Sequence, residues 1–372
     1  MVILYFLIAL LVLAVMITVH ELGHYTVGRL LGFKILDFSV GFGPAIIKKK
    51  SAKTGIVYAL RAIPLGGACR FYGEEDDPNE VNAEEGAVPF NSQKPWKRLL
   101  VIFAGPLMNF MLAYVLAFVM MLCFGQQKMV SYPNGDYAIT VNAASEDGPA
   151  YRAGIRAGDI IMRVGEYDIE AADGGFDGKT ELISKAIRES DGTLSITVLR
   201  AADKVECEYT VTDIYNAAEG QNKVDIVMGY TRYSEPYGFF RSFAEAGKFL
   251  ADIVATTFKA IFNGFKNGFS EGDVSGIVGT VAITMKMASL GVYYVLLVMV
   301  IISMSLGIMN LLPLLPLDGG HLLFDFIELV FGRPVPRKIQ NAFSMIGIFL
   351  LLALMVYATV GDIKGIFNGL YS

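Results

Sequence analysis

The sequence predicts a polytopic α-helical membrane protein with about four transmembrane helices, a membrane-associated β-hairpin and an inserted β-rich domain. Three observations predict this fold class. Of the 372 residues, 54% are hydrophobic and only 18% are charged, whereas soluble globular chains are about a quarter charged. The hydrophobic residues are concentrated in long uncharged runs. The stretches between these runs have the mixed composition of ordinary soluble protein.

Four uncharged runs are each long enough to cross the hydrocarbon core of a bilayer, which takes about 20 helical residues. They comprise residues 2–19, 99–124, 291–317 and 342–360. The first run has the length of a secretory signal peptide, but it lacks a basic start and a small-residue cleavage site. We therefore expect it to stay in the protein as the first transmembrane helix.

The segment 32–72 predicts the β-hairpin, lying near the membrane or dipping into it. Short β-prone runs such as residues 55–60 alternate with residues that favour tight turns, namely Gly41, Gly43, Pro44, Pro64, Gly66 and Gly67. An acidic segment from Glu74 to Glu85 follows, and we expect it to be solvated.

Basic residues in the short loops indicate the orientation in the membrane. The segment 32–98 is rich in Lys and Arg, and the loop between the third and fourth runs adds Arg333, Arg337 and Lys338. Both loops lie on one side of a four-span chain, so the positive-inside rule makes that side cytoplasmic. The inserted domain and the carboxyl terminus are then expected outside the cytoplasm.

Residues 129–232 predict the inserted β-rich domain, with alternating runs such as residues 194–199 that are typical of half-buried strands. Residues 233–275 predict an amphipathic connecting helix, because apolar residues such as Phe239, Phe243 and Phe249 recur at helical spacing. That helix fits either a position on the membrane surface or packing against the inserted domain. Residues 1–128 and 276–372 form the two parts of the membrane core, each with two helices.

A candidate metal site lies at the end of the first uncharged run. In His20-Glu-Leu-Gly-His24 the two histidines are four residues apart, so both imidazoles share one face of a helix and can bind one metal ion. Glu21 can then take a proton from water at the metal. Zinc suits this ligand set and keeps three protein ligands at a catalytic site. Ionisable groups at membrane depth are costly and normally functional.

The third ligand is expected from the segment 310–321, where Asp318 follows a run interrupted by Pro313 and Pro316. By itself, Asp before Gly is common turn chemistry. However, at about 1.5 Å per helical residue, Asp318 and His20 reach a similar depth on the cytoplasmic side. The remaining histidine of the chain, His321, is expected beside the site and not as a fourth ligand, which would occupy the position of water.

Other function classes are less well supported. No basic stripe suggests nucleic acid, and the three cysteines lie far apart, which favours isolated packed thiols. A metal carrier would distribute its ligands along a pathway, and a non-proteolytic membrane scaffold would not need Glu21. These two remain the alternatives.

Two paired motifs carry a resemblance to a known family. HELGH at residues 20–24 with Leu-Asp-Gly at 317–319 resembles the site-2 protease family of intramembrane zinc metalloproteases. Residues 103–109 are similar to the GPxxN segment of that family, and residues 310–320 to its NxxPxPxxLDG segment, with Pro316 one place later than in many members. The segment 32–72 resembles the membrane-associated β-hairpin of the family.

The resemblance implies a zinc metalloendopeptidase that cleaves transmembrane segments of membrane proteins, in regulated intramembrane proteolysis or in clearance of signal-peptide remnants. It implies that His20, His24 and Asp318 bind Zn²⁺, that Glu21 is the general base, and that Asn310 contacts the substrate backbone or the developing oxyanion. Asn109 is expected instead to form an interhelical hydrogen bond. The expected location is the cell membrane, with the active site near the cytoplasmic side.

The inserted domain carries a second resemblance. Residues 148–161, with Gly154, Gly158 and Asp159, are similar to the AGxxxGDxI signature of bacterial PDZ domains. Such domains bind an extended peptide or a carboxyl terminus along a sheet edge. A PDZ-like domain here is expected either to bind substrate or to act as a size filter.

Overall fold

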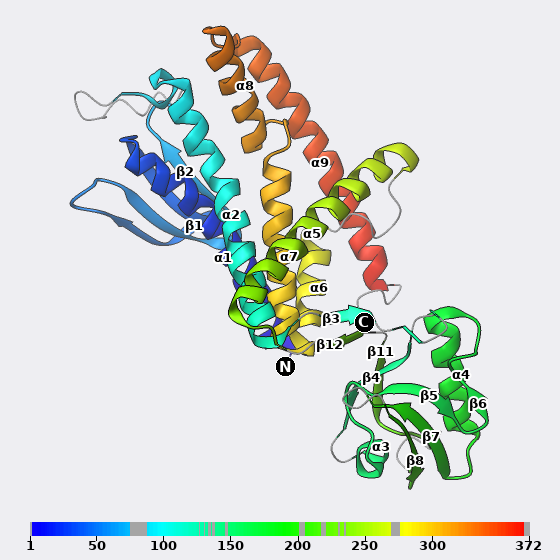
Figure 1. Cartoon of the computed structure of the whole chain (residues 1–372). Helices are drawn as coiled ribbons and strands as arrows, with labels where there is room; N and C mark the ends of the chain where they lie inside the picture. The colour runs from blue at the N-terminus through cyan, green and yellow to red at the C-terminus, as the bar shows by residue number, and fades with distance from the viewer. Residues whose placement is uncertain are drawn as a thin grey trace. The chain divides into compact units, whose positions relative to one another are not determined.

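The computed structural model describes residues 2–74, 88–125, 127–129, 131–132, 135, 138–145, 148–200, 205–216, 221–229, 231–233, 236–268 and 276–367. The chain forms two compact units (Figure 1). We call Met1–Met121 with Phe239–Ser372 the helical unit, and Leu122–Gly238 the β-rich unit. The acidic segment expected to be solvated lies outside the described residues except for Glu74.

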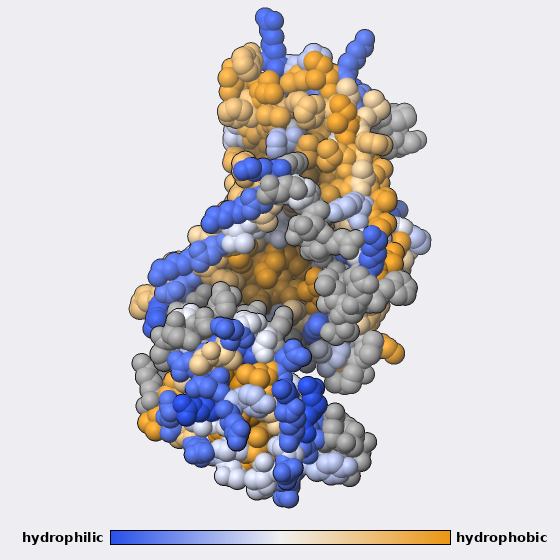
Figure 2. Space-filling model, turned by 90° about the vertical axis from the view of Figure 1, so that its right-hand side faces the viewer, coloured by the Kyte–Doolittle hydropathy of each residue, from blue (hydrophilic) through white to orange (hydrophobic). Residues whose placement is uncertain are grey.

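Four helices of the described chain are long and apolar enough to cross a membrane, as predicted. They are α1 (Val2–Leu30), α2 (Pro95–Phe124), α7 (Val292–Asn310) and α9 (Arg337–Phe367). Large apolar side chains on them face outward, for example Leu11 (63% exposed) and Phe349 (76% exposed). Figure 2 shows hydrophobic residues over much of the surface of the helical unit. Because exposed apolar area of this extent is unfavourable in water, these faces fit contact with lipid.

The third uncharged run differs from the prediction of one continuous span over residues 291–317. The helix α7 ends at Asn310, and a linker that contains Pro313 and Pro316 leads into a separate helix, α8 (Asp318–Phe331). Proline lacks an N–H group and clashes with the preceding helical turn, which explains the break. A further short helix, α6 (Ile277–Leu290), precedes α7. The second part of the helical unit therefore contains more than the two helices expected.

The amphipathic connecting helix is α5 (Phe239–Asn267), which groups with the helical unit. Its first turns pack on α2. The Tyr114 hydroxyl donates a hydrogen bond to the Phe243 carbonyl at 2.8 Å. The Tyr114 and Phe243 rings also meet edge to face, with 5.2 Å between their centroids.

The segment 32–72 forms the expected β-structure, with β1 (Ile35–Lys50) and β2 (Val57–Phe71). Each strand is bent, so four strand segments lie side by side, in the order 45–50, 57–61, 35–40 and 67–71. Gly41 permits the bend in β1. Its φ is +92°, and a Cβ atom there would lie 2.6 Å from the Ile63 carbonyl oxygen. A buried cluster holds the end of this sheet at which β1 begins and β2 ends. It includes Phe33, Ile35 and Phe71.

The β-rich unit is built on a six-stranded sheet in the order β11-β4-β5-β7-β8, with β6 paired to β5. These strands are β4 (Thr140–Ala144), β5 (Ile160–Val164), β6 (Tyr167–Asp168), β7 (Thr193–Leu199), β8 (Glu206–Thr212) and β11 (Ile226–Gly229). Two helices, α3 (Pro149–Ala153) and α4 (Gly175–Glu189), complete the unit. Its core includes the fully buried side chains of Ile139, Ile161 and Ile183. Short strand pairs β3 (Gln127–Met129) with β12 (Thr231–Tyr233), and β9 (Tyr215–Asn216) with β10 (Gln221–Asn222), lie outside the main sheet.

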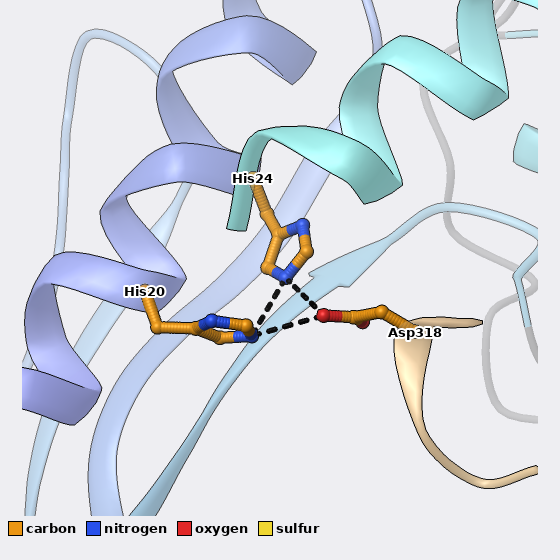
Figure 3. Close-up of side chains that lie close together, drawn as sticks. All are labelled: His20, His24 and Asp318. Carbon is orange, nitrogen blue, oxygen red and sulfur yellow. Dashed lines mark hydrogen bonds and ion pairs between the residues drawn. The ribbon is translucent and has the colours of Figure 1, made fainter. Parts of the chain in front are cut away.

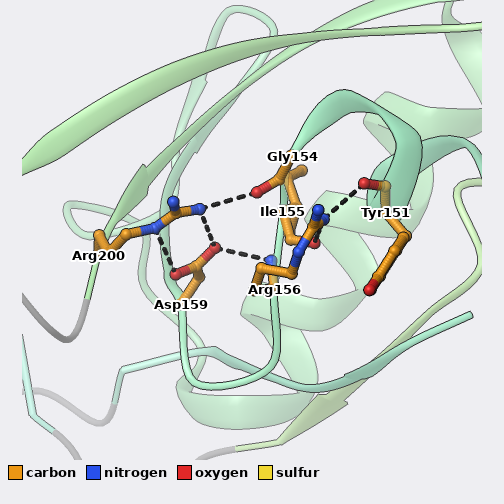
Figure 4. A network of polar contacts seen from close by, with 6 residues as sticks. All are labelled: Tyr151, Gly154, Ile155, Arg156, Asp159 and Arg200. Carbon is orange, nitrogen blue, oxygen red and sulfur yellow. Dashed lines mark hydrogen bonds and ion pairs between the residues drawn. The ribbon is translucent and has the colours of Figure 1, made fainter. Parts of the chain in front are cut away.

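A polar network orders the turn between α3 and β5 (Figure 4). The Asp159 carboxylate accepts hydrogen bonds from the Arg156 backbone N–H at 2.8 Å and from the Arg200 guanidinium at 3.3 Å. Arg200 also donates to the Gly154 carbonyl at 2.8 Å. Gly154 ends α3 with a φ of +112°, a conformation that glycine adopts without steric cost. The glycines and the aspartate of the 148–161 motif therefore form one turn.

Candidate metal centre

Three side chains that are far apart in the sequence converge in the helical unit (Figure 3). The Nε2 atoms of His20 and His24 on α1 lie 3.2 Å apart. The Oδ2 atom of Asp318, the first residue of α8, lies 3.1 Å from the His20 Nε2 and 3.6 Å from the His24 Nε2. Tetrahedral ligands at about 2.0–2.2 Å from a zinc ion lie about 3.3–3.6 Å from one another. The structure thus brings together the three predicted ligands at the spacing that zinc requires.

The chemistry of the three atoms also fits a cation. The His24 Nδ1 lies 2.9 Å from the Val101 carbonyl oxygen, so it carries the ring proton and leaves Nε2 with a free lone pair. Both histidines are 9% exposed. The Asp318 Oδ2 is buried and has no hydrogen-bond partner. Electron pairs that face one another without a proton repel, and a metal ion would remove that repulsion.

Asn109 on α2 lies against the outer nitrogen of His20, with 3.3 Å between its Nδ2 and the His20 Nδ1. If His20 binds metal through Nε2, its Nδ1 carries a proton and needs an acceptor. The Asn109 Oδ1 is buried without a partner. Rotating the amide by about 180° would exchange its oxygen and nitrogen, and Oδ1 would then accept a hydrogen bond from the His20 Nδ1–H. The backbone carbonyl of Asn109 also accepts a hydrogen bond from the Ser303 hydroxyl on α7 at 2.8 Å. Asn109 therefore makes the interhelical contact expected from the sequence and also touches the metal centre, which the sequence did not indicate.

Glycines permit the close approach of α2 to α1. A Cβ atom on Gly105 would lie 2.3 Å from the His24 Nε2 and 2.9 Å from the His20 Cε1. One on Gly23 would lie 2.2 Å from the Ala104 carbonyl oxygen. Distances below 3.0 Å leave no space for a methyl group, so these helices pack together only because both positions are glycine.

Glycines also place Asp318. The linker folds back on the first turn of α8, where a Cβ on Gly319 would lie 2.2 Å from the Leu312 carbonyl oxygen and one on Gly320 would lie 2.6 Å from the Leu315 backbone nitrogen. A Cβ on Gly347 of α9 would lie 1.6 Å from the Leu315 carbonyl oxygen. The Gly-Gly pair after Asp318 thus lets this linker pack against the helix that it starts.

Glu21 follows His20 on α1 and lies against β2. The backbone of Cys69 lies beside its carboxylate. A Cβ atom on Gly67 would lie 2.7 Å from the Glu21 Cγ. The 67–71 edge of the β1–β2 sheet therefore runs directly beside this carboxylate.

The other two predicted residues flank the centre. Asn310 is the last residue of α7, where the linker to Asp318 begins. His321 lies on α8 and is exposed. Among the described residues, the group with convergent ligand atoms consists of His20, His24 and Asp318, without His321.

Comparisons with known proteins place the chain in a family. The model of the family described as "Peptidase family M50" matches residues 8–354. A protein of Agrobacterium fabrum is 31% identical over 379 residues, covering 96% of this chain and 95% of its own length. One of Mesorhizobium japonicum is 32% identical with 96% and 97% coverage, and one of Clostridium acetobutylicum is 28% identical with 96% and 96% coverage. Each of the three is named "Putative zinc metalloprotease".

Proposed function

We propose that this chain, which belongs to peptidase family M50, is an intramembrane zinc metalloprotease whose metal is held by His20, His24 and Asp318. The family match confirms the resemblance to site-2 proteases. The observation that carries the assignment of ligands is the convergence of two imidazole nitrogens on α1, which is long and apolar enough to cross a membrane, with an orphaned carboxylate oxygen at the start of α8. A metal carrier or a scaffold would not need the general base that lies beside them.

The residues around the metal have separate roles in the proposed reaction. When bound, zinc supplies Lewis acidity, which polarises the scissile carbonyl and makes water acidic enough to lose a proton near neutral pH. Glu21 accepts that proton and passes it to the leaving amine, and its side chain lies beside Gly67 of β2. Asn310 contacts the substrate backbone or stabilises the developing oxyanion.

The substrate is a transmembrane segment of another membrane protein. A helical peptide bond has its carbonyl engaged in a backbone hydrogen bond, so the segment must unwind before it is cleaved. We assign the unwound strand to the 67–71 edge of β2, where main-chain pairing would hold it. This edge lies beside Glu21, because Gly67 allows the close approach of the two chains.

Metal removal tests the function directly. The purified chain should cleave a panel of single-span reporter proteins in detergent, lose that activity on treatment with a chelator, and regain it when zinc is added back. Asp318→Ala should lower both zinc content and cleavage, because it removes one of three ligands. His321→Ala is the matched control, and both quantities should stay near those of the wild type. A metal-free wild type that is well folded and cleaves the panel would refute the proposal.

We assign residues 1–128 and 276–372 to the protease core, residues 233–275 to a connecting helix and residues 129–232 to a PDZ-like domain. The turn around Gly154, Gly158 and Asp159 supports the PDZ-like assignment. We further place this domain outside the cytoplasm and the metal centre near the cytoplasmic side, because of the basic residues in the loops. The β1–β2 sheet then lies at the cytoplasmic membrane face.

A labelling experiment tests this orientation together with peptide binding. In a background without the native cysteines, Val227→Cys on β11, which is 59% exposed, should react with a membrane-impermeant maleimide in intact cells. Lys49→Cys on β1 should react only after the membrane is opened. Extended peptides that pair with β11 should slow the reaction of Val227→Cys. The reversed labelling pattern would refute the orientation, and failure of a broad peptide panel to protect would favour a size filter.

A further inference from the structure

A buried ion-pair cluster joins α2 to α8, the helix that begins with Asp318. The Arg98 guanidinium lies 2.8 Å from the Asp325 Oδ1 and 2.5 Å from the Glu328 Oε2. Arg98 also donates a hydrogen bond to the Asn91 carbonyl at 2.8 Å. The residue is only 5% exposed. One guanidinium thus holds two carboxylates of α8 and is itself fixed in position.

The contacts of α8 give this cluster particular importance. The outward face of α8 is apolar and unpacked, with Phe326 56% exposed and Phe331 74% exposed. Asp325 follows Asp318 by two helical turns, so the two residues share a face of α8. A constraint on Asp325 therefore also sets the rotation of the helix that carries the third ligand.

The helix α2 already locates the other two ligands. Its Val101 backbone carbonyl accepts a hydrogen bond from the His24 Nδ1–H, Gly105 lies against both imidazoles, and Asn109 contacts His20. Arg98 stands one turn before Val101 on the same helix. Contacts with one helix, α2, therefore help to fix the positions of all three ligands.

We propose that Arg98 is a positioning residue for the metal centre, which holds Asp318 within reach of His20 and His24 by clamping α8 to α2. This inference rests on the proposed function. Buried ion pairs contribute little net stability because desolvation offsets their attraction. In this cluster, moreover, the Arg98 Nε and the Asp325 Oδ2 have no partner. The cluster is therefore explained better by its effect on the position of α8 than by a contribution to the free energy of unfolding.

The test measures zinc affinity of the full chain in detergent, by competition with a chelator. Arg98→Lys keeps the positive charge but loses the two-pronged geometry of the guanidinium. We expect the Kd for zinc to rise about 10–100-fold, the range for loss of residues that orient metal ligands. Glu328→Gln is a second, milder variant that keeps the Arg98–Asp325 pair, and its Kd should rise less. An unchanged Kd in both variants would overturn the proposal.

A double-mutant cycle shows whether Arg98 acts through Asp318. If it does, Arg98→Lys should raise the Kd of the Asp318→Ala variant by less than about twofold, because the effects of substitutions at coupled residues are not additive. If the double variant instead raises the Kd for zinc by the product of the two single-variant factors, the inference is wrong. Zinc binding by Asp318→Ala as tight as that of the wild type would instead refute the proposed ligand set itself.

Asp362→Asn is the matched control for general destabilisation. Asp362 on α9 is 1% exposed and accepts hydrogen bonds from the Gly276 and Gly279 backbone N–H groups at the start of α6. Its loss should lower the temperature of unfolding and leave the Kd for zinc within about twofold of the wild type. An equal loss of zinc affinity in Asp362→Asn and Arg98→Lys would show that Arg98 acts only through stability.

Discussion

Glu21→Gln is expected to retain zinc and to lower the rate of peptide cleavage by about 10²–10⁴-fold, the usual contribution of general acid–base catalysis. Gln has the shape of Glu and fits the same space beside Gly67 of β2. It cannot take up a proton. Because Glu21 is not one of the three convergent ligands, the metal site itself should remain intact.

The measurement pairs zinc content with cleavage of single-span reporter proteins by the purified variant. Glu74→Gln is the matched control, since the Glu74 carboxylate also lies against β2, where it accepts a hydrogen bond from the Phe71 backbone N–H at 3.0 Å. It should cleave like the wild type. Equal cleavage by Glu21→Gln and wild type would remove Glu21 from the mechanism, and loss of zinc would give it a role at the metal.

Gly105→Ala is expected to disable the metal centre although it adds only one methyl group. The new Cβ would lie 2.3 Å from the His24 Nε2, the atom that faces the metal, and 2.4 Å from the His24 Cε1. Either the imidazole or α2 must move. Overpacking of a tight site costs about 1–3 kcal/mol, which corresponds to about 5–150-fold in zinc affinity if the strain falls on the loaded site.

Zinc titration and cleavage assays of Gly105→Ala would test this expectation. Gly361→Ala on α9 is a suitable control, because a Cβ atom there meets nothing within 4 Å. Its zinc affinity should equal that of the wild type. Normal zinc binding by Gly105→Ala would mean that the histidines reach the metal from other positions. It would also mean that α2 does not fix where they lie.

Much of the candidate site follows from local rules that operate along one helix. An uncharged run long enough to span a bilayer predicts α1 by length alone, and a spacing of four residues puts His20 and His24 on one face whatever the rest of the chain does. The same reasoning finds the other spans, because membrane insertion depends on composition over a window and not on partners. Turn residues likewise predict the β1–β2 segment.

Other features depend on contacts between segments that are distant in sequence. The position of Asp318 at the start of α8, and not at the end of a span, results from a linker that can fold back only against Gly319 and Gly320. The roles of α2 were hidden for a different reason. A carbonyl acceptor at Val101 and a missing side chain at Gly105 have no chemical signature in a sequence.

Asn109 and Arg98 illustrate the same limit. Asn109 reads as a polar residue in a membrane helix, and Arg98 as an interfacial basic residue, because sequence reports the kind of side chain but not what faces it. Composition and helical periodicity thus determined the membrane class and the histidine pair of this protein, and they pointed to Glu21 as the candidate general base. Only the tertiary structure decided which helix supports the metal centre, because close packing and buried charge pairing arise when separate helices meet.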